Sequence, residues 1–184
     1  MKFNITKLEG VYIIDSYKFA DERGTFIKTY HDVKYKEAGI SYELKESFYT
    51  ISKKDVIRGM HFQVPPFDYS KLVYVIEGEV IDVILDLRKG APTYGKHISV
   101  QLSGENARQV YIPEGFAHGF ATLSCHAKVI YLQSKVHAPQ YDLGIRWNSF
   151  GMNWGIKSPI LSRRDQLFPT LDEFNAPFLF EGKS

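Results

Sequence analysis

Two histidines in this chain have surroundings suited to proton-transfer chemistry. His61 lies within residues 58–63, which read Arg-Gly-Met-His-Phe-Gln, and His118 lies within residues 113–120, which read Pro-Glu-Gly-Phe-Ala-His-Gly-Phe. Glycines and aromatic residues surround both. An imidazole titrates nearest to neutral pH of all side chains, so it suits a general base. The pattern offers both histidines as pocket residues and leaves a purely structural role open for each.

The second segment resembles half of the cupin pattern, Pro-x-Gly-x-x-His, which belongs to a jelly-roll barrel that often holds a metal. The metal half requires His-x-His and a nearby Glu, because a divalent ion needs three or four nitrogen or oxygen ligands converging on one point. Gln63 stands where the second histidine of the first segment would be. We therefore predict a cupin-type pocket without a metal or other cofactor, in which His61 is free to act as a base.

β-Branched and aromatic runs predict the strands that must position these side chains. Such runs occupy Val11–Ile14, Leu72–Ile76, Val80–Leu87 and Val129–Leu132. Turn signals separate them, and Gly78 predicts a tight hairpin between the second and third runs. Helical periodicity is confined to residues 31–38 and 163–174, and Pro169 interrupts the second stretch. We expect an all-β, cupin-type jelly roll (a double-stranded β-helix) with short peripheral helices.

Length and composition indicate one globular domain across residues 1–184. The hydrophobic share of 44%, charged share of 24% and aromatic share of 15% suit a soluble β protein. A net charge of +2 argues against nucleic acid as a partner. The single Cys125 excludes an intramolecular disulfide and fits a reducing compartment. With no secretion signal or apolar span of about 20 residues, we expect a cytoplasmic protein without a membrane partner.

Several short segments, in their order and spacing, resemble the dTDP-4-dehydrorhamnose 3,5-epimerase family of nucleotide-sugar epimerases over nearly the full chain. They are residues 21–26, 58–66, 71–73, 82–88, 92–95, 102–106, 112–120, 144–148 and 161–165. The resemblance implies a cupin-like homodimer that acts on a nucleoside-diphosphate 4-keto-6-deoxy sugar without a metal or redox cofactor. It also implies a place in the biosynthesis of bacterial surface polysaccharides.

A 4-keto sugar gives this chemistry a definite form. The carbonyl acidifies the protons at C3 and C5, so inversion needs a base, a positive group beside the enolate oxygen and an acid on the opposite face. His61 suits the base. The resemblance implies that Asp165 pairs with His61 and that Lys71 faces the enolate oxygen. Asp82 is predicted to orient Lys71 or His118; the alternative is that Lys71 and Asp82 form a solvated pair on an outer face.

Further residues are predicted to bind the substrate. Arg23 and Arg58 match family positions that contact the diphosphate, for which a guanidinium offers two parallel donors. The resemblance implies that Arg23 reaches the partner subunit's site, and the alternative is a loop charge near Asp21. His118 is predicted either to form the pocket floor or to contact sugar or phosphate. Gln63 is also predicted to contact the substrate.

Several positions depart from the family pattern. Lys28 and Glu46 replace the usual Glu and Gln of the base pocket. A carboxylate at position 46 could accept both the N1–H and N2–H₂ donors of guanine, so we expect GDP in preference to dTDP. Tyr69 replaces a Gln near the sugar. His137, within His-Ala-Pro, replaces the Tyr-x-Pro tyrosine proposed as the family's acid, and an imidazole is a poorer standing acid than a phenol, which predicts inversion at C3 alone.

The sequence therefore predicts a cofactor-independent epimerase that inverts C3 of a nucleotide-activated 4-keto hexose or heptose. One alternative is a C3/C5 double epimerase in which His137 serves as the second acid. The others are a 3,4-ketoisomerase, a non-catalytic sugar-nucleotide binding module and a metal-dependent cupin dioxygenase. Gln63 disfavours the ketoisomerase, which usually carries a second pocket histidine there. A binding module would hold its ligand without exchanging the ligand's protons with solvent.

Overall fold

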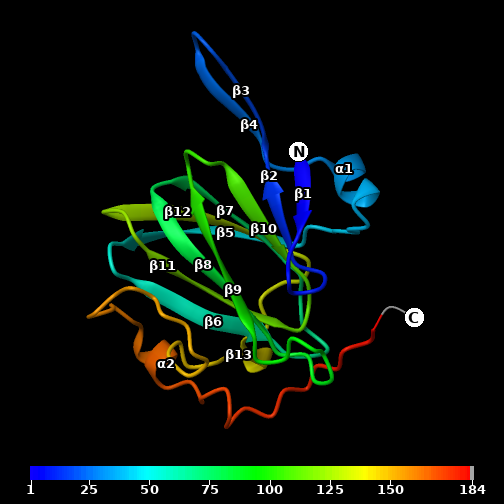
Figure 1. Ribbon diagram of the computed structural model, residues 1–184, viewed down its shortest axis with the longest axis vertical. Coiled ribbons are helices and arrows are strands. Elements are labelled where there is room, and N and C mark those ends of the chain that lie inside the picture. Colours follow the sequence, from blue (N-terminus) through cyan, green and yellow to red (C-terminus); the bar gives the residue numbers. More distant parts are fainter. Residues whose placement is uncertain (183–184) are drawn as a thin grey trace.

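The computed structural model describes residues 1–182 and consists mainly of antiparallel strands (Figure 1). Its elements, in chain order, are β1 (Lys2–Ile5), β2 (Tyr12–Asp15), β3 (Tyr17–Asp21), β4 (Gly24–Lys28), α1 (Asp32–Glu37), β5 (Glu46–Lys53), β6 (Ile57–Gln63), β7 (Lys71–Glu77), β8 (Glu79–Asp86), β9 (His97–Ser103), β10 (Arg108–Ile112), β11 (Phe116–Thr122), β12 (His126–Gln133), the 3₁₀ turn η1 (Pro139–Tyr141), β13 (Asp142–Gly144) and α2 (Arg163–Gln166).

Two antiparallel sheets enclose the main core. The larger has the strand order β1-β2-β10-β7-β12-β5, and the smaller has the order β13-β6-β11-β8-β9. Val73 and Val129 of the larger sheet share one buried apolar cluster with Ile84 and Phe120 of the smaller sheet. Apolar burial of this kind is the main favourable term in folding. The arrangement confirms the predicted all-β jelly roll.

Alternation along β12 decides which of its side chains face the core. Ala127, Val129, Tyr131 and Gln133 are buried, and the residues between them are more exposed. This period of two is that of a strand with one buried face. Gln133 pairs with Lys71 of β7, so the register brings two polar residues together at one end of an otherwise apolar interior.

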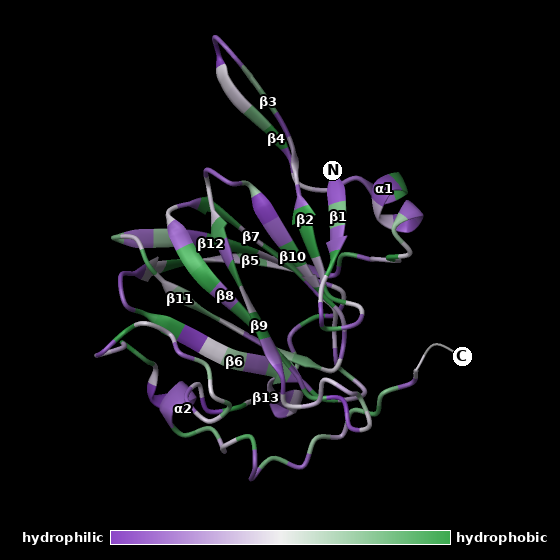
Figure 2. Ribbon diagram, in the orientation of Figure 1, coloured by the Kyte–Doolittle hydropathy of each residue, from purple (hydrophilic) through white to green (hydrophobic). Residues whose placement is uncertain are grey.

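Both faces of the smaller sheet are covered, and its central strand β11 is therefore buried along its whole length. The core between the sheets covers one face. Trp154 and Phe178, from the segment after β13, share a second buried cluster with Met60 and Ala117. Figure 1 shows this segment running beneath β6 and β13, and Figure 2 shows hydrophobic residues recurring along it although it has little regular structure.

The four predicted strands overlap β2, β7, β8 and β12, and the first predicted helix overlaps α1, so these predictions are confirmed. The predicted hairpin at Gly78 is wrong, because β7 and β8 belong to different sheets and the chain crosses between them there. Gly78 has φ +78°, and a side chain would lie 2.1 Å from the carbonyl oxygen of His126. The second predicted helix is limited to α2, since Pro169 disfavours a helical conformation at the residue before it.

β3 and β4 form a hairpin that stands away from both sheets (Figure 1). We call residues 17–28 the arm. Within the described chain its two strands pair with each other and with no other strand. Phe19 and Phe26 face each other across the hairpin and are 51% and 55% exposed. Large apolar side chains so open to water are typical of a surface that another molecule covers.

Candidate active site

A cavity of about 200 Å³ lies between the two sheets. Five of its nine lining residues were predicted from the sequence and lie on β6, on β11, at the start of β7 or just before it, and the other four lie on β5 and β12. The lining residues are Phe48, Thr50, Arg58, His61, Tyr69, Lys71, His118, Tyr131 and Gln133. The two sheets thus bring together side chains that are up to 85 positions apart in the chain.

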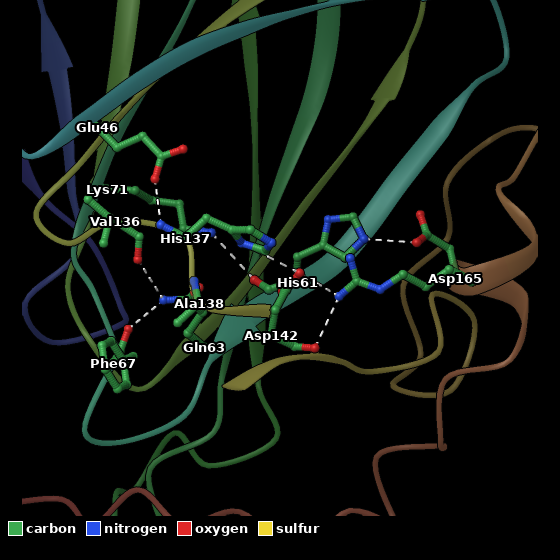
Figure 3. A network of polar contacts seen from close by, with 11 residues as sticks. Glu46, His61, Gln63, Phe67, Lys71, Val136, His137, Ala138, Asp142 and Asp165 are labelled. Atoms are coloured by element: carbon green, nitrogen blue, oxygen red, sulfur yellow. Dashed lines mark hydrogen bonds and ion pairs between the residues drawn. The ribbon is translucent and has the colours of Figure 1, made fainter. Parts of the chain in front are cut away.

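His61 and Asp165 form a hydrogen-bonded pair at this cavity. Nε2 of His61 lies 2.9 Å from Oδ1 of Asp165, whose side chain is only 4% exposed, whereas that of His61 is 31% exposed (Figure 3). A carboxylate only accepts hydrogen bonds, so it fixes the proton of a neutral imidazole on Nε2. Nδ1 then carries the free lone pair. This pairing is the one that the resemblance implied.

Local structure explains how Asp165 is held. Ser162 caps α2 by accepting a hydrogen bond from the backbone N–H of Asp165 at 3.0 Å. The backbone N–H of Gly59 donates to the second carboxylate oxygen at 3.1 Å. Burial alone would raise the pKa of Asp165, but the hydrogen bonds from His61, Gly59 and Ser162 outweigh it and hold the pKa below its usual value. Asp165 is therefore an anion fixed by three partners.

Lys71 is buried at the start of β7, with only 4% of its surface exposed. Its ammonium nitrogen lies 3.4 Å from the carbonyl oxygen of His61 and 4.9 Å from the centre of the Tyr69 ring. Burial lowers the pKa of Lys71 to about 8, and the charges of Asp82 and Asp142 oppose that fall. The alternative of a solvated pair on an outer face is wrong for Lys71 and Asp82, because both are buried.

His118 and Asp82 form a second, fully buried pair. Nε2 of His118 lies 2.7 Å from Oδ2 of Asp82, and the two residues are 3% and 0% exposed. Burial lowers the pKa of His118, which favours the neutral imidazole. His118 faces His61 across the β6–β11 ladder, so both predicted histidines do reach the same cavity. The predicted orientation of His118 by Asp82 agrees with this geometry.

Tyr131 lines the cavity and was not among the residues predicted from the sequence. Its ring stacks on Phe48 at 4.7 Å and meets His118 edge-on at 6.0 Å. Burial raises the pKa of its phenol, so the hydroxyl keeps its proton. The signal in the sequence was the alternation that puts Tyr131 on the same face of its strand as Gln133. Inside an apolar run that signal also fits an ordinary core tyrosine.

A second hollow, of about 430 Å³, adjoins the first and shares Arg58 and His61 with it. The remaining lining residues come from β6 and from the segment that leads into α2: Val56, Ile57, Ile160, Leu161, Ser162, Arg164 and Asp165. Nε of Arg58 donates to Ser52 at 2.9 Å, and the residue lines both hollows. Arg58 is therefore placed as an anion-binding residue would need to be.

The loop after β12 is held by two predicted substrate-binding residues (Figure 3). Gln63 donates to the carbonyl of Phe67 at 2.6 Å and accepts from the N–H of Ala138 at 2.6 Å. Glu46 accepts from the backbone N–H of His137 at 2.5 Å. Gln63 is buried and its amide is occupied by backbone groups, so we interpret it as a loop anchor rather than a substrate contact.

His137 projects from that loop with half of its side chain exposed, and it does not belong to the cavity lining. Its Nδ1 lies 3.9 Å from Asp142, a carboxylate that also binds Arg164 at 2.8 Å. Asp142 and Arg164 were not predicted from the sequence. Arg164 lies in the family-like segment 161–165 but was given no role there, and only the pairing of β13 with β6 brings Asp142 beside the site.

Arg23 and Lys28 belong to the arm, which stands away from both sheets (Figure 1), and neither residue lines the cavity or the adjoining hollow. Arg23 is close to the hairpin turn and binds the carboxylate of Asp21, with its side chain 82% exposed. Within one chain, this contact agrees with the alternative reading of Arg23 as a loop charge near Asp21. Within one chain, neither residue joins His61, and a role at the site requires the arm of another subunit.

Among residues 1–182, no group of three or more His, Cys, Asp or Glu side chains is arranged to hold a metal ion. The two histidines of the cavity are each paired with one carboxylate. In the same part of the chain, no helix is long and apolar enough to cross a membrane.

The chain matches proteins of known family. A family model described as dTDP-4-dehydrorhamnose 3,5-epimerase matches residues 5–173. The dTDP-4-dehydrorhamnose 3,5-epimerase of Shigella flexneri is 39% identical over 175 residues, and the match covers 92% of this chain and 97% of that protein.

Solved structures are similar over most of their length. The dTDP-6-deoxy-D-glucose-3,5-epimerase of Legionella pneumophila, in complex with dTDP-4-keto-L-rhamnose, has a TM-score of 0.93 at 34% identity and covers 100% of this chain and 99% of its own. A 3'-monoepimerase from Streptomyces bikiniensis in complex with dTDP has a TM-score of 0.87 at 25% identity and covers 91% and 86%. That second structure is a double mutant, with one histidine changed to asparagine and a tyrosine seventy positions later changed to phenylalanine.

Proposed function

The chain belongs to the dTDP-4-dehydrorhamnose 3,5-epimerase family of nucleotide-sugar epimerases, and we propose that it epimerises a nucleoside-diphosphate 4-keto sugar by proton abstraction and reprotonation. The observation that carries this proposal is the grouping of His61, Lys71 and Tyr131 around one cavity. A base, a cation and a protonated phenol are the three groups that an enolate mechanism requires.

His61 takes the proton next to the carbonyl. Because Asp165 fixes the imidazole proton on Nε2, the free lone pair on Nδ1 abstracts the sugar proton. The resulting imidazolium is stabilised by the Asp165 carboxylate, which is kept in place by the N–H of Gly59 donating to it and by the backbone N–H of Asp165 donating to Ser162. The electron pair of the broken C–H bond moves onto the carbonyl oxygen, which becomes the enolate.

Lys71 stabilises that enolate oxygen. An ammonium in a water-poor cavity interacts more strongly with a developing oxyanion than it would in water. Tyr131 then donates its proton to the carbon from the face opposite His61, which inverts the centre. The raised pKa of Tyr131 suits this role, because the phenol stays protonated until the enolate needs a proton.

The spacing of His61 and Tyr131 in the sequence also supports Tyr131 as the acid. His61 and Tyr131 are seventy positions apart, as are the histidine and the tyrosine that were changed together in the Streptomyces bikiniensis structure. The sequence placed His137 at the position of the family's acid, as a poorer acid than a phenol, and left it the acid role only in the alternative of a C3/C5 double epimerase. We propose Tyr131 instead, because it lines the cavity and His137 does not.

This choice bears on how many centres are inverted. The prediction of C3 alone rested on a missing phenol, and a phenol is available in the cavity. We therefore propose exchange at both C3 and C5, with C3 alone as the alternative. A 3,5-epimerase and a 3'-monoepimerase both occur among the similar structures, so overall similarity supports either outcome.

The nucleotide is a separate part of the proposal. The expectation of GDP depended on Glu46 offering its carboxylate to guanine, but one oxygen of Glu46 accepts from the backbone of His137. Two similar structures are complexes with dTDP or a dTDP sugar. We propose a dTDP sugar as the first candidate. GDP remains the second candidate, favoured by the free oxygen of Glu46 and by Lys28.

We also propose that the chain acts as a homodimer in which the arm of one subunit covers the other. The arm exposes Tyr17, Phe19 and Phe26, and the edge strand β5 exposes Tyr49 and Ile51. A second copy would bury both apolar surfaces. It would also bring Arg23 toward the partner's diphosphate-binding residues, where Arg58 lies in the hollow beside His61.

Mass spectrometry in D₂O tests the function. The protein is incubated with dTDP- and GDP-linked 4-keto-6-deoxy hexoses, and the mass gain of each is followed with time. We expect the dTDP sugar to gain two deuteriums and the GDP sugar to react more slowly. A gain of one deuterium would support inversion at C3 alone. Tight binding without any mass gain would identify a binding module and contradict the proposal.

A further inference from the structure

The role proposed for Lys71 beside the enolate does not explain how a buried lysine keeps its positive charge. Its side chain is fully enclosed, and a buried ammonium is strongly disfavoured unless a negative charge compensates it. Only the charged form can stabilise an enolate. The site must therefore contain groups that keep the proton on Lys71.

Asp82 is placed to be one such group. It is 0% exposed, and Oδ2 binds His118 at 2.7 Å. Within residues 1–182 its other oxygen, Oδ1, has no hydrogen-bond partner. An ionised oxygen buried without a partner is costly unless a positive charge lies near it. His118 lies between β6 and β8 and lines the same cavity as Lys71, and the charge of Asp82 acts on the buried Lys71. The other cation of the lining, Arg58, is exposed.

Asp142 lies on β13, at the edge of the smaller sheet next to β6, and its charge also acts on Lys71. Lys71 contacts the carbonyl oxygen of His61, and Gly144 of β13 pairs with His61. Asp142 lies two residues before Gly144 on that strand. Its carboxylate binds Arg164 at 2.8 Å, which neutralises part of its charge. Its effect on Lys71 is accordingly smaller than that of Asp82.

We propose that Asp82 and Asp142 are positioning residues that act through Lys71, holding its side chain in the ammonium form inside the cavity. Asp82 supplies the larger effect from the buried side, and Asp142 the smaller effect from β13. The inference deepens the proposed function, because it assumes that charged Lys71 stabilises the enolate. It gives Asp82 a role that does not depend on contact with substrate.

Other titratable groups surround Lys71 on the elements packed against it. They are Arg58 and His61 on β6, Tyr69 before β7, His118 on β11, Tyr131 on β12 and Arg164 on α2. Burial favours the neutral forms of His118, Tyr69 and Tyr131. Asp82 and Asp142 are the two carboxylates whose charges support Lys71.

The sign of the pH effect follows from the chemistry. Lys71 is active when protonated, so the rate must fall as pH rises through its pKa of about 8. Removing a carboxylate lowers that pKa further and moves the loss of activity to lower pH. A fall of ~1 unit, usual for the loss of a close opposite charge, would lower the charged fraction about fivefold at pH 8 and by about a quarter at pH 6.5.

The test compares pH–rate profiles of deuterium incorporation for the wild type, Asp82→Asn and Asp142→Asn. We expect both variants to lose activity at lower pH than the wild type, with the larger displacement for Asp82→Asn. Glu77→Gln is the matched control, because Glu77 is a half-exposed carboxylate at the far end of β7 from Lys71. Its profile should coincide with that of the wild type.

A second measurement follows the protonation of Lys71 by NMR in the absence of substrate. Lysine is labelled with ¹³C at Cε, the Lys71 resonance is assigned with Lys71→Arg, and its titration is followed in each variant. We expect a midpoint near 8 in the wild type and lower midpoints in the two Asp variants. If Asp82→Asn does not fold, Asp142→Asn carries the test, because Asp142 lies on the short edge strand β13.

Two outcomes would overturn the inference. One is a uniform loss of rate with an unmoved alkaline limb, which would mean that Asp82 only orients His118. The other is an unchanged Lys71 titration in both variants. A protein that exchanges no sugar protons, yet shows the expected titration shifts, would instead contradict the proposed function and leave the electrostatic role standing.

Discussion

At the scale of single residues, the most consequential side chain is that of Tyr131, which no sequence motif indicated. Tyr131 lies in a run of apolar residues, where a buried tyrosine is ordinarily a core residue. Its chemistry follows from what lies opposite it in the cavity, and that depends on how the two sheets face each other. His61, Lys71 and Asp165 could be predicted because each lies in a segment whose order and spacing resemble the family.

Changing Tyr131 to Phe separates exchange from inversion. Without the phenol, His61 can still remove a proton and return a solvent deuteron to the same face. We expect Tyr131→Phe to keep deuterium uptake into the substrate while inverted product falls by ~10²–10⁴-fold, the usual contribution of a positioned acid. NMR of the recovered sugar measures both quantities. The converse result, loss of inversion in His137→Asn with Tyr131→Phe unaffected, would return the acid role to His137.

At the scale of elements, the site is positioned by the register between β13 and β6 and by the close contact of Gly144 with Phe168. β13 pairs with β6 so that Gly144 is opposite His61, and Phe168 packs edge-on against the His61 ring at 5.7 Å. A Cβ on Gly144 would lie 2.3 Å from the Phe168 ring. The absence of a side chain at 144 is therefore what lets Phe168 support the imidazole.

Gly144→Ala should displace Phe168 and loosen His61. We expect a loss of ~1–3 kcal/mol in the free energy of unfolding, as for other overpacked sites, together with a clear drop in kcat. Calorimetry and the deuterium assay measure these effects. Gly182→Ala, where a Cβ meets only ordinary contact, is the control. Phe168→Leu in the Gly144→Ala background should recover stability, and no recovery would exclude the steric explanation.

Strand positions could be predicted because β-branched and aromatic runs are local signals, whereas sheet membership is not local. The residues flanking Gly78 fit a hairpin as well as a crossover, and only long-range pairing with β12 and β11 separates β7 from β8. The same limit applies to Asp142. Its three-residue strand has no propensity signal, and its place beside the site depends on pairing with β6, whose partner residues lie 79 to 83 positions earlier.

At the scale of the whole molecule, the arm is the feature that one chain does not explain. It carries Arg23 far from the cavity and leaves Phe19 and Phe26 half exposed. The proposed homodimer accounts for both observations. The single-domain organisation and a cytoplasmic location stay predictions from the sequence.

Subunit mixing tests whether Arg23 serves the partner's site. Arg23→Ala and His61→Asn are each expected to be nearly inactive alone. In a mixed dimer, the subunit that keeps His61 would receive the intact Arg23 of the other subunit, so one site of two is complete. Random exchange of equal amounts should restore about a quarter of wild-type activity. No recovery, with dimers confirmed by light scattering, would show that Arg23 does not act across the interface.

The most direct test of the whole account is deuterium wash-in by His61→Asn, measured by mass spectrometry on the nucleotide sugar that the wild type turns over. Asn keeps a polar group near Asp165 but cannot take the proton, so we predict that exchange falls by several orders of magnitude. Circular dichroism and nucleotide binding should stay near wild-type values, because His61 is partly exposed and is proposed to act on the sugar, not to bind the nucleotide. Exchange at wild-type rates in a folded His61→Asn protein would contradict the account.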